Sequence, residues 1–161
     1  MNSSQKQFLK LANNPFKFGM FLLYKLPAAF FSGVRVRKID EGKCITSVPF
    51  TWLTQNPFRS TYFASLAMAA EMSTGLLAMS NTYKRFPSTS MLLTTMEAAY
   101  FKKATGTTFF TCEEGVKISQ TVDVAYVTKK GEAIKVKTTG KNNNGELVAE
   151  FLFTWSFKVK K

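Results

Sequence analysis

The sequence predicts an α+β domain in which a curved antiparallel sheet wraps around one long helix. Two observations carry this prediction: an apolar helical pattern occupies residues 62–79, and the chain after it reads mostly as strands. A single long helix followed by strands that we expect to form a meander is typical of this class. A length of 161 residues suits one domain. We therefore expect residues 1–32 to form a helical extension packed on a single domain of residues 33–161.

The extension is expected to contain two short helices separated between Asn13 and Pro15. Asn14 can cap the second helix, because the proline after it suits a first helical turn. The apolar run of residues 16–31 follows two lysines and so hints at a signal peptide, but Lys25 and Pro27 interrupt it. We interpret this segment as a loosely amphipathic extension that lies across an apolar surface.

Strand signals begin after the extension. Alternation of apolar and basic side chains over residues 34–39 predicts a half-buried strand. A turn at residues 40–42 then allows the next segment to return as a hairpin partner. Residues 116–129 fit both helical and strand periodicity, and we favour a helix. The other strand-like segments are residues 44–50, 91–100, 107–111, 132–139 and 146–158.

Residues 62–79 are the strongest helical segment, because the good helix formers Ala, Leu and Met dominate it. Apolar residues occupy all sides of this helix, so we expect it to be buried on most sides. Its many Ser, Thr and Gly residues favour a buried helix of a soluble domain over a membrane span, and we expect no integral membrane association. Glu71 is the only charged residue between Ser60 and Tyr83. By helical spacing it shares a face with Ala64, Ala67, Met68, Thr74, Gly75 and Ala78.

The net charge of +12, from 22 Lys and Arg against 10 Asp and Glu, favours an anionic partner. The basic residues are scattered, and no RNA-recognition motif, helix-turn-helix pattern or basic tail is present. We therefore expect a small anionic molecule and no nucleic acid as partner, beside the alternative of an ordinary solvated basic surface. Sixteen Phe residues indicate either a large core or an apolar cavity.

The chain contains no His and only two Cys, Cys44 and Cys112. This composition excludes Ser-His-Asp catalysis, histidine acid–base catalysis and a Cys/His nucleophile pair. Zinc-binding cysteine spacing is also absent, so we expect neither a metal nor a resident cofactor. Two cysteines give no disulfide framework, which favours the reducing cytoplasm.

Residues 56–75 contain Asn56, Ser60 and an Ala-Glu pair ending at Glu71. The segment resembles the entry to the central helix of hotdog-fold acyl-CoA thioesterases. In that family an Asn and a Ser or Thr precede His-Gly-Gly, and an acidic residue follows at the spacing of Glu71. Segments near residues 95–100 and 145–155 are similar to two strands of the family, so the resemblance covers about residues 33–160.

Five positions depart from the family motif. Tyr62 stands at the His position, Phe63 and Ala64 replace the two glycines, Arg59 replaces an earlier Gly, and Ala69 replaces a Leu. The sequence is therefore similar to a branch of the superfamily that lacks the His-Gly-Gly motif and is classed as a domain of unknown function.

The resemblance implies a hotdog fold and an acyl-CoA thioesterase that works as a homodimer or a dimer of dimers, with coenzyme A as part of the substrate. It implies Glu71 as general base or nucleophile, and Asn56 as the residue that orients water or polarises the thioester carbonyl. Tyr62 can donate its hydroxyl to an oxyanion, and free N–H groups of Phe63 and Ala64 can do the same. Each side chain also has a structural interpretation: Glu71 as a paired structural carboxylate, Asn56 as a turn former, and Tyr62 as a core aromatic.

Basic residues near the helix ends and in the loop after residue 100 are candidates for the coenzyme A phosphates, beside the alternative that each one only aids solubility. They are Arg59, Lys84, Arg85, Lys102 and Lys103. Glu71 lies seven to nine residues after the helix start, about 11–14 Å along the axis. Within one chain, Glu71 and the N–H groups at the helix start are therefore too far apart to contact one reaction centre directly. They can act together only through water or across a subunit interface. The alternative function is a non-catalytic hotdog module that binds acyl-CoA or acyl chains.

Overall fold

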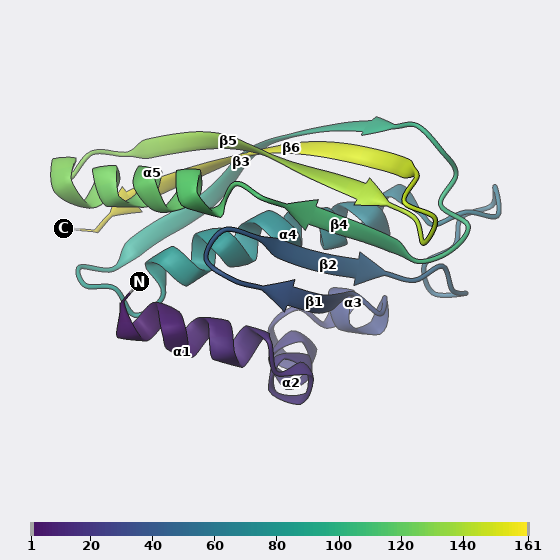
Figure 1. Ribbon diagram of the computed structural model, residues 1–161, viewed down its shortest axis with the longest axis horizontal. Helices are drawn as coiled ribbons and strands as arrows, with labels where there is room; N and C mark the ends of the chain where they lie inside the picture. Colours follow the sequence, from purple (N-terminus) through teal and green to yellow (C-terminus); the bar gives the residue numbers. More distant parts are fainter. Residues whose placement is uncertain (1, 161) are drawn as a thin grey trace.

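The computed structural model describes residues 2–160, which form a six-stranded sheet wrapped around one long helix (Figure 1). The five helices are α1 (Ser3–Ala12), α2 (Pro15–Lys25), α3 (Pro27–Phe31), α4 (Phe63–Thr82) and α5 (Gly115–Thr128). The six strands are β1 (Arg35–Ile39), β2 (Cys44–Val48), β3 (Thr89–Tyr100), β4 (Thr108–Cys112), β5 (Glu132–Lys141) and β6 (Leu147–Val159). This architecture confirms the α+β class and the sheet around a central helix.

The strand order in the sheet is β1-β2-β4-β5-β6-β3, and all neighbouring strands are antiparallel. The strands after α4 therefore do not form a simple meander, because β3 pairs with β6 and not with β4, the next strand along the chain. Local sequence patterns carry no information on which strands pair at long range. The consequence for function is that the long strand β3 lies at one edge of the sheet.

Helix α4 occupies the hollow of the sheet and is held there by buried polar contacts as well as by apolar packing. Thr46 Oγ1 donates a hydrogen bond of 2.6 Å to the Ala69 carbonyl, and the Ser73 and Thr138 hydroxyls lie 2.8 Å apart. By length and composition α4 could cross a membrane, but 67% of its apolar stretch is buried inside the protein. This agrees with the expected buried helix.

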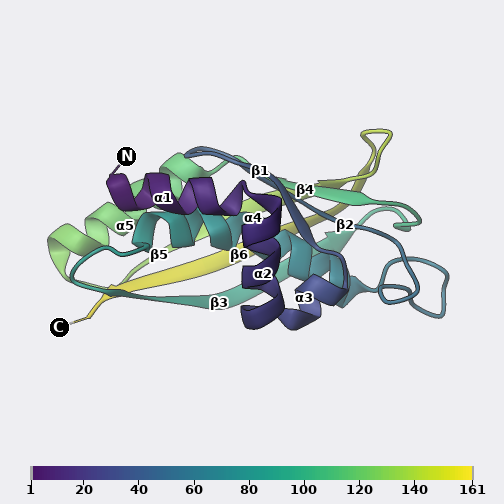
Figure 2. The ribbon, with the colours of Figure 1, turned by 90° about the horizontal axis from the view of Figure 1, so that it is seen from below.

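The N-terminal helices lie against the side of α4 that the β5–β6–β3 part of the sheet leaves open (Figures 1 and 2). The break between α1 and α2 falls where it was expected, and the Asn14 side chain accepts a hydrogen bond from the Lys17 N–H as the cap of α2. Asn13 fixes the junction to β1: its amide donates to the Ile39 carbonyl at 2.7 Å and accepts from the Ile39 N–H at 3.0 Å. The short helix α3 was not predicted.

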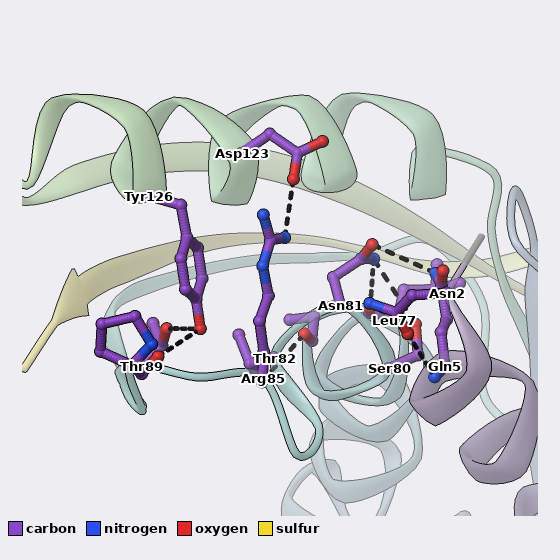
Figure 3. A network of polar contacts seen from close by, with 12 residues as sticks. Asn2, Gln5, Leu77, Ser80, Asn81, Thr82, Arg85, Thr89, Asp123 and Tyr126 are labelled. Atoms are coloured by element: carbon purple, nitrogen blue, oxygen red, sulfur yellow. Dashed lines mark hydrogen bonds and ion pairs between the residues drawn. The ribbon is translucent and has the colours of Figure 1, made fainter.

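A polar network at the C-terminal end of α4 joins three other elements to this helix (Figure 3). Gln5 of α1 donates to the Asn81 side chain at 3.1 Å. Arg85 pairs with Asp123 of α5 at 2.6 Å, and the Tyr126 hydroxyl accepts from Thr89 at the start of β3. The segment 116–129, whose sequence fits both helical and strand periodicity, forms helix α5, as we favoured. This helix covers one end of the sheet.

Candidate functional site

A hollow of about 590 Å³ lies at the N-terminal end of α4, which is a volume typical of small-molecule sites. Its walls are mainly aromatic and aliphatic, and the loop that follows β3 closes one side. The lining residues are Asn56, Pro57, Phe58, Ser60, Thr61, Tyr62, Phe63, Leu66, Tyr100, Phe101, Lys102 and Lys103. The structure therefore brings together five of the residues singled out from the sequence: Asn56, Tyr62, Phe63, Lys102 and Lys103.

Two tethers hold this end of α4 in place. The Thr61 N–H and hydroxyl both donate to the Ala104 carbonyl, at 2.8 and 3.1 Å, which joins the helix entry to the loop after β3. The Tyr62 N–H donates to the Thr54 carbonyl at 2.6 Å. Because the loop and helix are joined on both sides, the hollow has a defined shape.

The first turn of α4, which begins at the hollow, has free backbone donors at Phe63, which lines the hollow, and at Ala64, which does not. The Tyr62 carbonyl accepts from the Ser65 and Leu66 N–H groups, whereas the N–H groups of Phe63 and Ala64 find no acceptor among the described residues. Tyr62 occupies the cap position but its side chain makes no capping hydrogen bond. Free N–H groups at the positive end of a helix dipole can bind a carbonyl oxygen or an oxyanion.

Asn56 shapes the loop that precedes α4. Its side-chain oxygen accepts from the Phe58 N–H at 3.0 Å and from the Ser60 N–H and hydroxyl at 3.2 Å. This is the turn-forming role considered as the structural alternative. The amide nitrogen of Asn56 donates to no acceptor within residues 2–160, so it is the part of this side chain that a ligand could use.

The Tyr62 side chain is 46% exposed and meets the Phe63 ring edge to face, with centroids 4.7 Å apart. The side chain thus forms part of the wall of the hollow and not of the core. Phe63, which is 53% exposed, adds bulk where the family motif has glycine. The Phe63 side chain therefore occupies space beside the free N–H groups that a glycine would leave open.

The five candidate phosphate-binding residues do not form one cluster. Lys102 and Lys103 lie at the hollow, and Lys102 is paired with Glu146. Arg59 is beside the hollow, in a shallow surface depression with Gln55, Asn56 and Pro57.

Lys84 and Arg85 follow the C-terminal end of α4, about 30 Å along the helix from the hollow. Arg85 is occupied there by Asp123, and its guanidinium lies 3.7 Å from the Tyr126 ring centroid (Figure 3). Within one chain these two residues therefore cannot contact a ligand in the hollow. These two residues lie beside α4 in the sequence, but the two ends of a 20-residue helix are far apart in space. Position in the sequence therefore did not reveal this separation.

Glu71 lies in the middle of α4, away from the hollow, with its carboxylate beside the Trp155 indole. A Cβ atom added at Gly75 would lie 2.7 Å from Glu71 Oε1 and 3.2 Å from the Trp155 ring, so the glycine provides the space for both. Burial raises the pKa of Glu71 to about 7. Neither a hydrogen bond nor an ion pair to the carboxylate is found within residues 2–160. An apolar surrounding without a nearby cation disfavours the ionised carboxylate and so raises the pKa of the carboxyl group.

The face of α4 that carries Glu71 is open over its first half only. Ala64, Ala67, Met68 and Glu71 are partly exposed, whereas residues 72–78 are buried. The neighbouring half of β3 is open as well.

Met96 and Ala98 of β3 are exposed although they pair with Phe153 and Phe151, which are fully buried. Directly paired residues point to the same face of a sheet. An apolar surface on the core side of the sheet is thus left uncovered between β3 and α4.

A second hollow of about 400 Å³ lies over strands β4 and β5 and has a charged lining. Its carboxylates are already neutralised, because Glu113 pairs with Lys43 and Glu114 pairs with Lys117. In the part of the chain that the structure describes, no group of three His, Cys, Asp or Glu residues is arranged to hold a metal.

Phe58, Leu66, Tyr100 and Phe101 line the hollow but were not predicted as site residues. Tyr100 and Phe101 left a usable signal, since two aromatics end a strand just before a basic loop. Burial raises the pKa of Tyr100, which lies in the wall of the hollow. Trp155 left no signal, because its position beside Glu71 depends on the pairing of distant strands.

Comparison with known proteins identifies the fold. Residues 18–157 match the model of a protein family described as a domain of unknown function (DUF4442). No curated protein matches the sequence.

Solved structures match over nearly the whole chain. A protein of unknown function from Pseudomonas aeruginosa, described as a probable thioesterase, is 15% identical with a TM-score of 0.77 and covers 99% of both chains. A thioesterase from Haemophilus influenzae is 9% identical with a TM-score of 0.65, over 92% of this chain and 93% of its own. The PaaI protein from the phenylacetic acid degradation operon of E. coli is 14% identical with a TM-score of 0.63, over 93% and 96% of the two chains. At these identities the likeness establishes the hotdog fold and leaves the reaction open.

Proposed function

Because the chain belongs to the DUF4442 family and has a hotdog fold, we propose that it hydrolyses acyl thioesters at a site completed by a second copy of the chain. The observation that carries the proposal is the unpaired carboxylate of Glu71, whose pKa is near 7, on an open face of the helix that also provides free N–H groups. A carboxylate with this pKa is suited to general base catalysis near neutral pH.

The distance between Glu71 and the helix start supports a second copy. Glu71 lies eight residues after Phe63, or about 12 Å along the axis of α4, which is too far for both to contact one thioester group. A two-fold axis that passes beside α4 near Ala67 would place Glu71 of one copy beside Phe63 of the other. The small side chains of Ala64 and Ala67 permit close approach of two such helices.

The exposed strand β3 supports the same arrangement. Edge strands carry unpaired backbone groups and readily pair with another chain, and a two-fold dimer is the commonest closed assembly. Pairing of two β3 edges would also cover the exposed Met96 and Ala98. We therefore propose a homodimer, from which a dimer of dimers can form.

In the proposed reaction the N–H groups of Phe63 and Ala64 bind the thioester carbonyl oxygen. Glu71 of the other copy takes a proton from a water molecule, and the oxygen of that water attacks the carbonyl carbon. The N–H groups stabilise the resulting oxyanion. The carbon–sulfur bond then breaks, and the leaving thiolate takes the proton back from Glu71. The products are a carboxylic acid and a thiol, and Asn56 can orient the water through its amide nitrogen.

The hollow supplies the proposed substrate contacts. Its aromatic wall suits an acyl group, and Lys103 and Lys102 at its rim suit the phosphates of coenzyme A. The residues required by this scheme are side chains and backbone groups of the chain itself, so it involves no cofactor other than the coenzyme A of the substrate. We also propose a cytoplasmic location, since Cys44 and Cys112 are free although they are directly paired neighbours on β2 and β4.

The test is thiol release from short, medium, long and aromatic acyl-CoAs by the wild type and by Glu71→Gln. This substitution keeps the shape of the side chain and removes the base, so turnover should fall about 100-fold or more. Glu132→Gln, on β5, is the matched control and should leave the rate unchanged. Equal turnover by Glu71→Gln and the wild type would refute the catalytic role.

A non-catalytic module that binds acyl-CoA is the second candidate. The specific observation in its favour is the bulky Phe63 beside the free N–H groups, where the thioesterase motif has glycine. Tight binding of an acyl-CoA by the wild type without release of free thiol would select this function instead.

A further inference from the structure

Helix α2 has a second apolar face that points away from the protein. Phe18 and Leu22 are buried on the side of α2 that packs against α1, α3 and β1. On the opposite side Phe16, Met20 and Tyr24 follow one another at a spacing of four residues, and they are 78%, 40% and 76% exposed. A helix that only covers a soluble domain presents polar residues on its outer face, so the outer face of α2 requires another explanation.

Exposed apolar side chains also follow α2 along the chain, in the segment that packs against it. Leu26, at the junction with α3, is 44% exposed, and Phe31, at the end of α3, is 60% exposed. We call the set of Phe16, Met20, Tyr24, Leu26 and Phe31 the outer stripe. Contiguous exposed apolar residues of this kind mark surfaces that contact a partner or a lipid phase.

The charged side chains of the extension are all positive. Lys17 and Lys25 are exposed next to Phe16 and Tyr24 in the sequence, and Lys10 lies in the last turn of α1. The first acidic residue of the whole sequence is Asp40. Large apolar side chains beside lysines, without any carboxylate, complement a surface that has negative headgroups over a hydrocarbon layer.

We propose that the outer stripe docks the protein on an anionic lipid bilayer. Helix α2 lies parallel to the bilayer surface, with Phe16, Met20 and Tyr24 inserted at the headgroup boundary and Lys17 and Lys25 against the lipid phosphates. The eleven residues of α2 extend only about 16 Å, roughly half of the thickness of the hydrocarbon layer, so this is attachment and not insertion across the bilayer.

A second copy of the chain fits the outer stripe less well. Packing of two such stripes would bring Lys17 and Lys25 of each copy close to the same lysines of the other, and no carboxylate on the extension offsets that repulsion. An anionic lipid surface provides both the apolar phase and the opposite charge.

The proposed dimer would strengthen this attachment to the bilayer. That increase rests on the proposed function, whereas attachment through a single outer stripe does not. Two sheets joined along their β3 edges are related by an axis perpendicular to the sheet. Since α1–α3 lie on one side of the α4 layer (Figures 1 and 2), both outer stripes would then face the same way. Two attachment points on one surface bind much more strongly than one.

The test is co-sedimentation of the full chain with vesicles of phosphatidylcholine alone and of phosphatidylcholine mixed with phosphatidylglycerol. The wild type should bind the mixed vesicles, and added salt should weaken binding. The triple variant Phe16→Ser, Met20→Ser, Tyr24→Ser should bind at least about tenfold more weakly, because it loses most of the apolar contact. Val127→Ser removes an apolar side chain that is 83% exposed on α5 and should bind as the wild type does.

A second variant, Lys17→Glu with Lys25→Glu, leaves the apolar stripe intact and changes only exposed side chains. It should lose binding to the mixed vesicles by about tenfold or more, with an unchanged circular dichroism spectrum. Wild-type protein that stays in the supernatant with mixed vesicles would overturn the proposal, as would full binding by both variants. If the wild type does not bind vesicles and the triple variant is a monomer where the wild type is a dimer, the outer stripe is instead a contact between two copies of the chain. Thiol release is measured in a separate assay, so neither the vesicle-binding result nor the mass of the variants depends on thioesterase activity.

Discussion

Glu71 places a carboxylate beside the Trp155 indole, where burial disfavours the charged form and no cation compensates its charge within residues 2–160. Gly75 makes this position available, because any larger residue would compete with the Glu71 carboxylate for space near the indole ring. The raised pKa results from burial, and residues of α4 and β6 are among the surroundings that bury Glu71. It gives the folded protein a measurable dependence on pH.

The free energy of unfolding should fall as pH rises from 4.5 to 7. Below pH 4.5 Glu71 is protonated in both the folded and the unfolded chain, so it adds no penalty. Between the ordinary pKa of 4.5 and the folded value of about 7, the folded chain retains a proton that the unfolded chain releases. Above pH 7 the buried charge costs up to about 3 kcal/mol.

Urea unfolding of the wild type and of Glu71→Gln at several pH values measures this effect. The variant should be more stable than the wild type above pH 7, and the difference should disappear below pH 4.5. A constant difference at all pH values would show that Glu71 is not titrating in this range.

Among the elements, α5 is fixed to the β1–β2 hairpin at a contact that only glycine allows. The Gly115 N–H donates to the Gly42 carbonyl at 3.0 Å. A Cβ atom at Gly115 would lie 2.2 Å from the Glu41 carbonyl oxygen and 2.8 Å from Gly42 Cα. The start of α5 therefore depends on close approach of two backbones.

Gly115→Ala should lower the free energy of unfolding by about 3 kcal/mol, because backbone atoms on both sides must shift. Chemical denaturation measures this loss. Gly131→Ala is the matched control: it lies between α5 and β5 with nothing within 4 Å of an added Cβ, and it should change stability by less than about 1 kcal/mol. Equal stability of the two variants would contradict the backbone contact at Gly115.

The whole molecule leaves one apolar surface open between β3 and the first half of α4. Met96 is 48% exposed there, although its pair on β6, Phe153, is fully buried. An assembly that covers this surface would also join the free N–H groups of one copy to Glu71 of the other. Oligomeric state and catalysis are therefore coupled in the proposed function.

Met96→Asp should convert a dimer of twice the 18.1 kDa chain mass into a monomer. An unpaired carboxylate in an apolar interface should weaken dimerisation by about 100-fold or more. Light scattering measures the mass, and thiol release should fall with it although Glu71 and α4 are unchanged. Val124→Asp, at a residue of similar exposure on α5, should keep both the mass and the activity. Full activity in a monomeric variant would exclude a shared site.

Much of the candidate site was predictable, because it depends on local sequence. Asn56, Tyr62 and Phe63 lie in one short segment, so the position of the helix start brought them together at the hollow. Lys84 and Arg85, which the sequence also offered as phosphate-binding candidates, lie at the opposite end of α4 from the hollow. Leu66, Tyr100 and Phe101 were missed because they reach the site only when β3 and its loop return to α4.

The sequence by itself determined the elements of this protein. Apolar periodicity, the Asn14 cap and the run of helix formers around Glu71 are local features, and they predicted the central helix, the two N-terminal helices and the strands within a few residues. Only the tertiary structure decided that β3 pairs with β6 at the edge of the sheet, that Trp155 lies beside Glu71, and that the outer stripe of α2 faces outward. These features depend on contacts between residues far apart in the chain, whose pairing is set by the packing of the whole core and leaves no periodic pattern in any one segment.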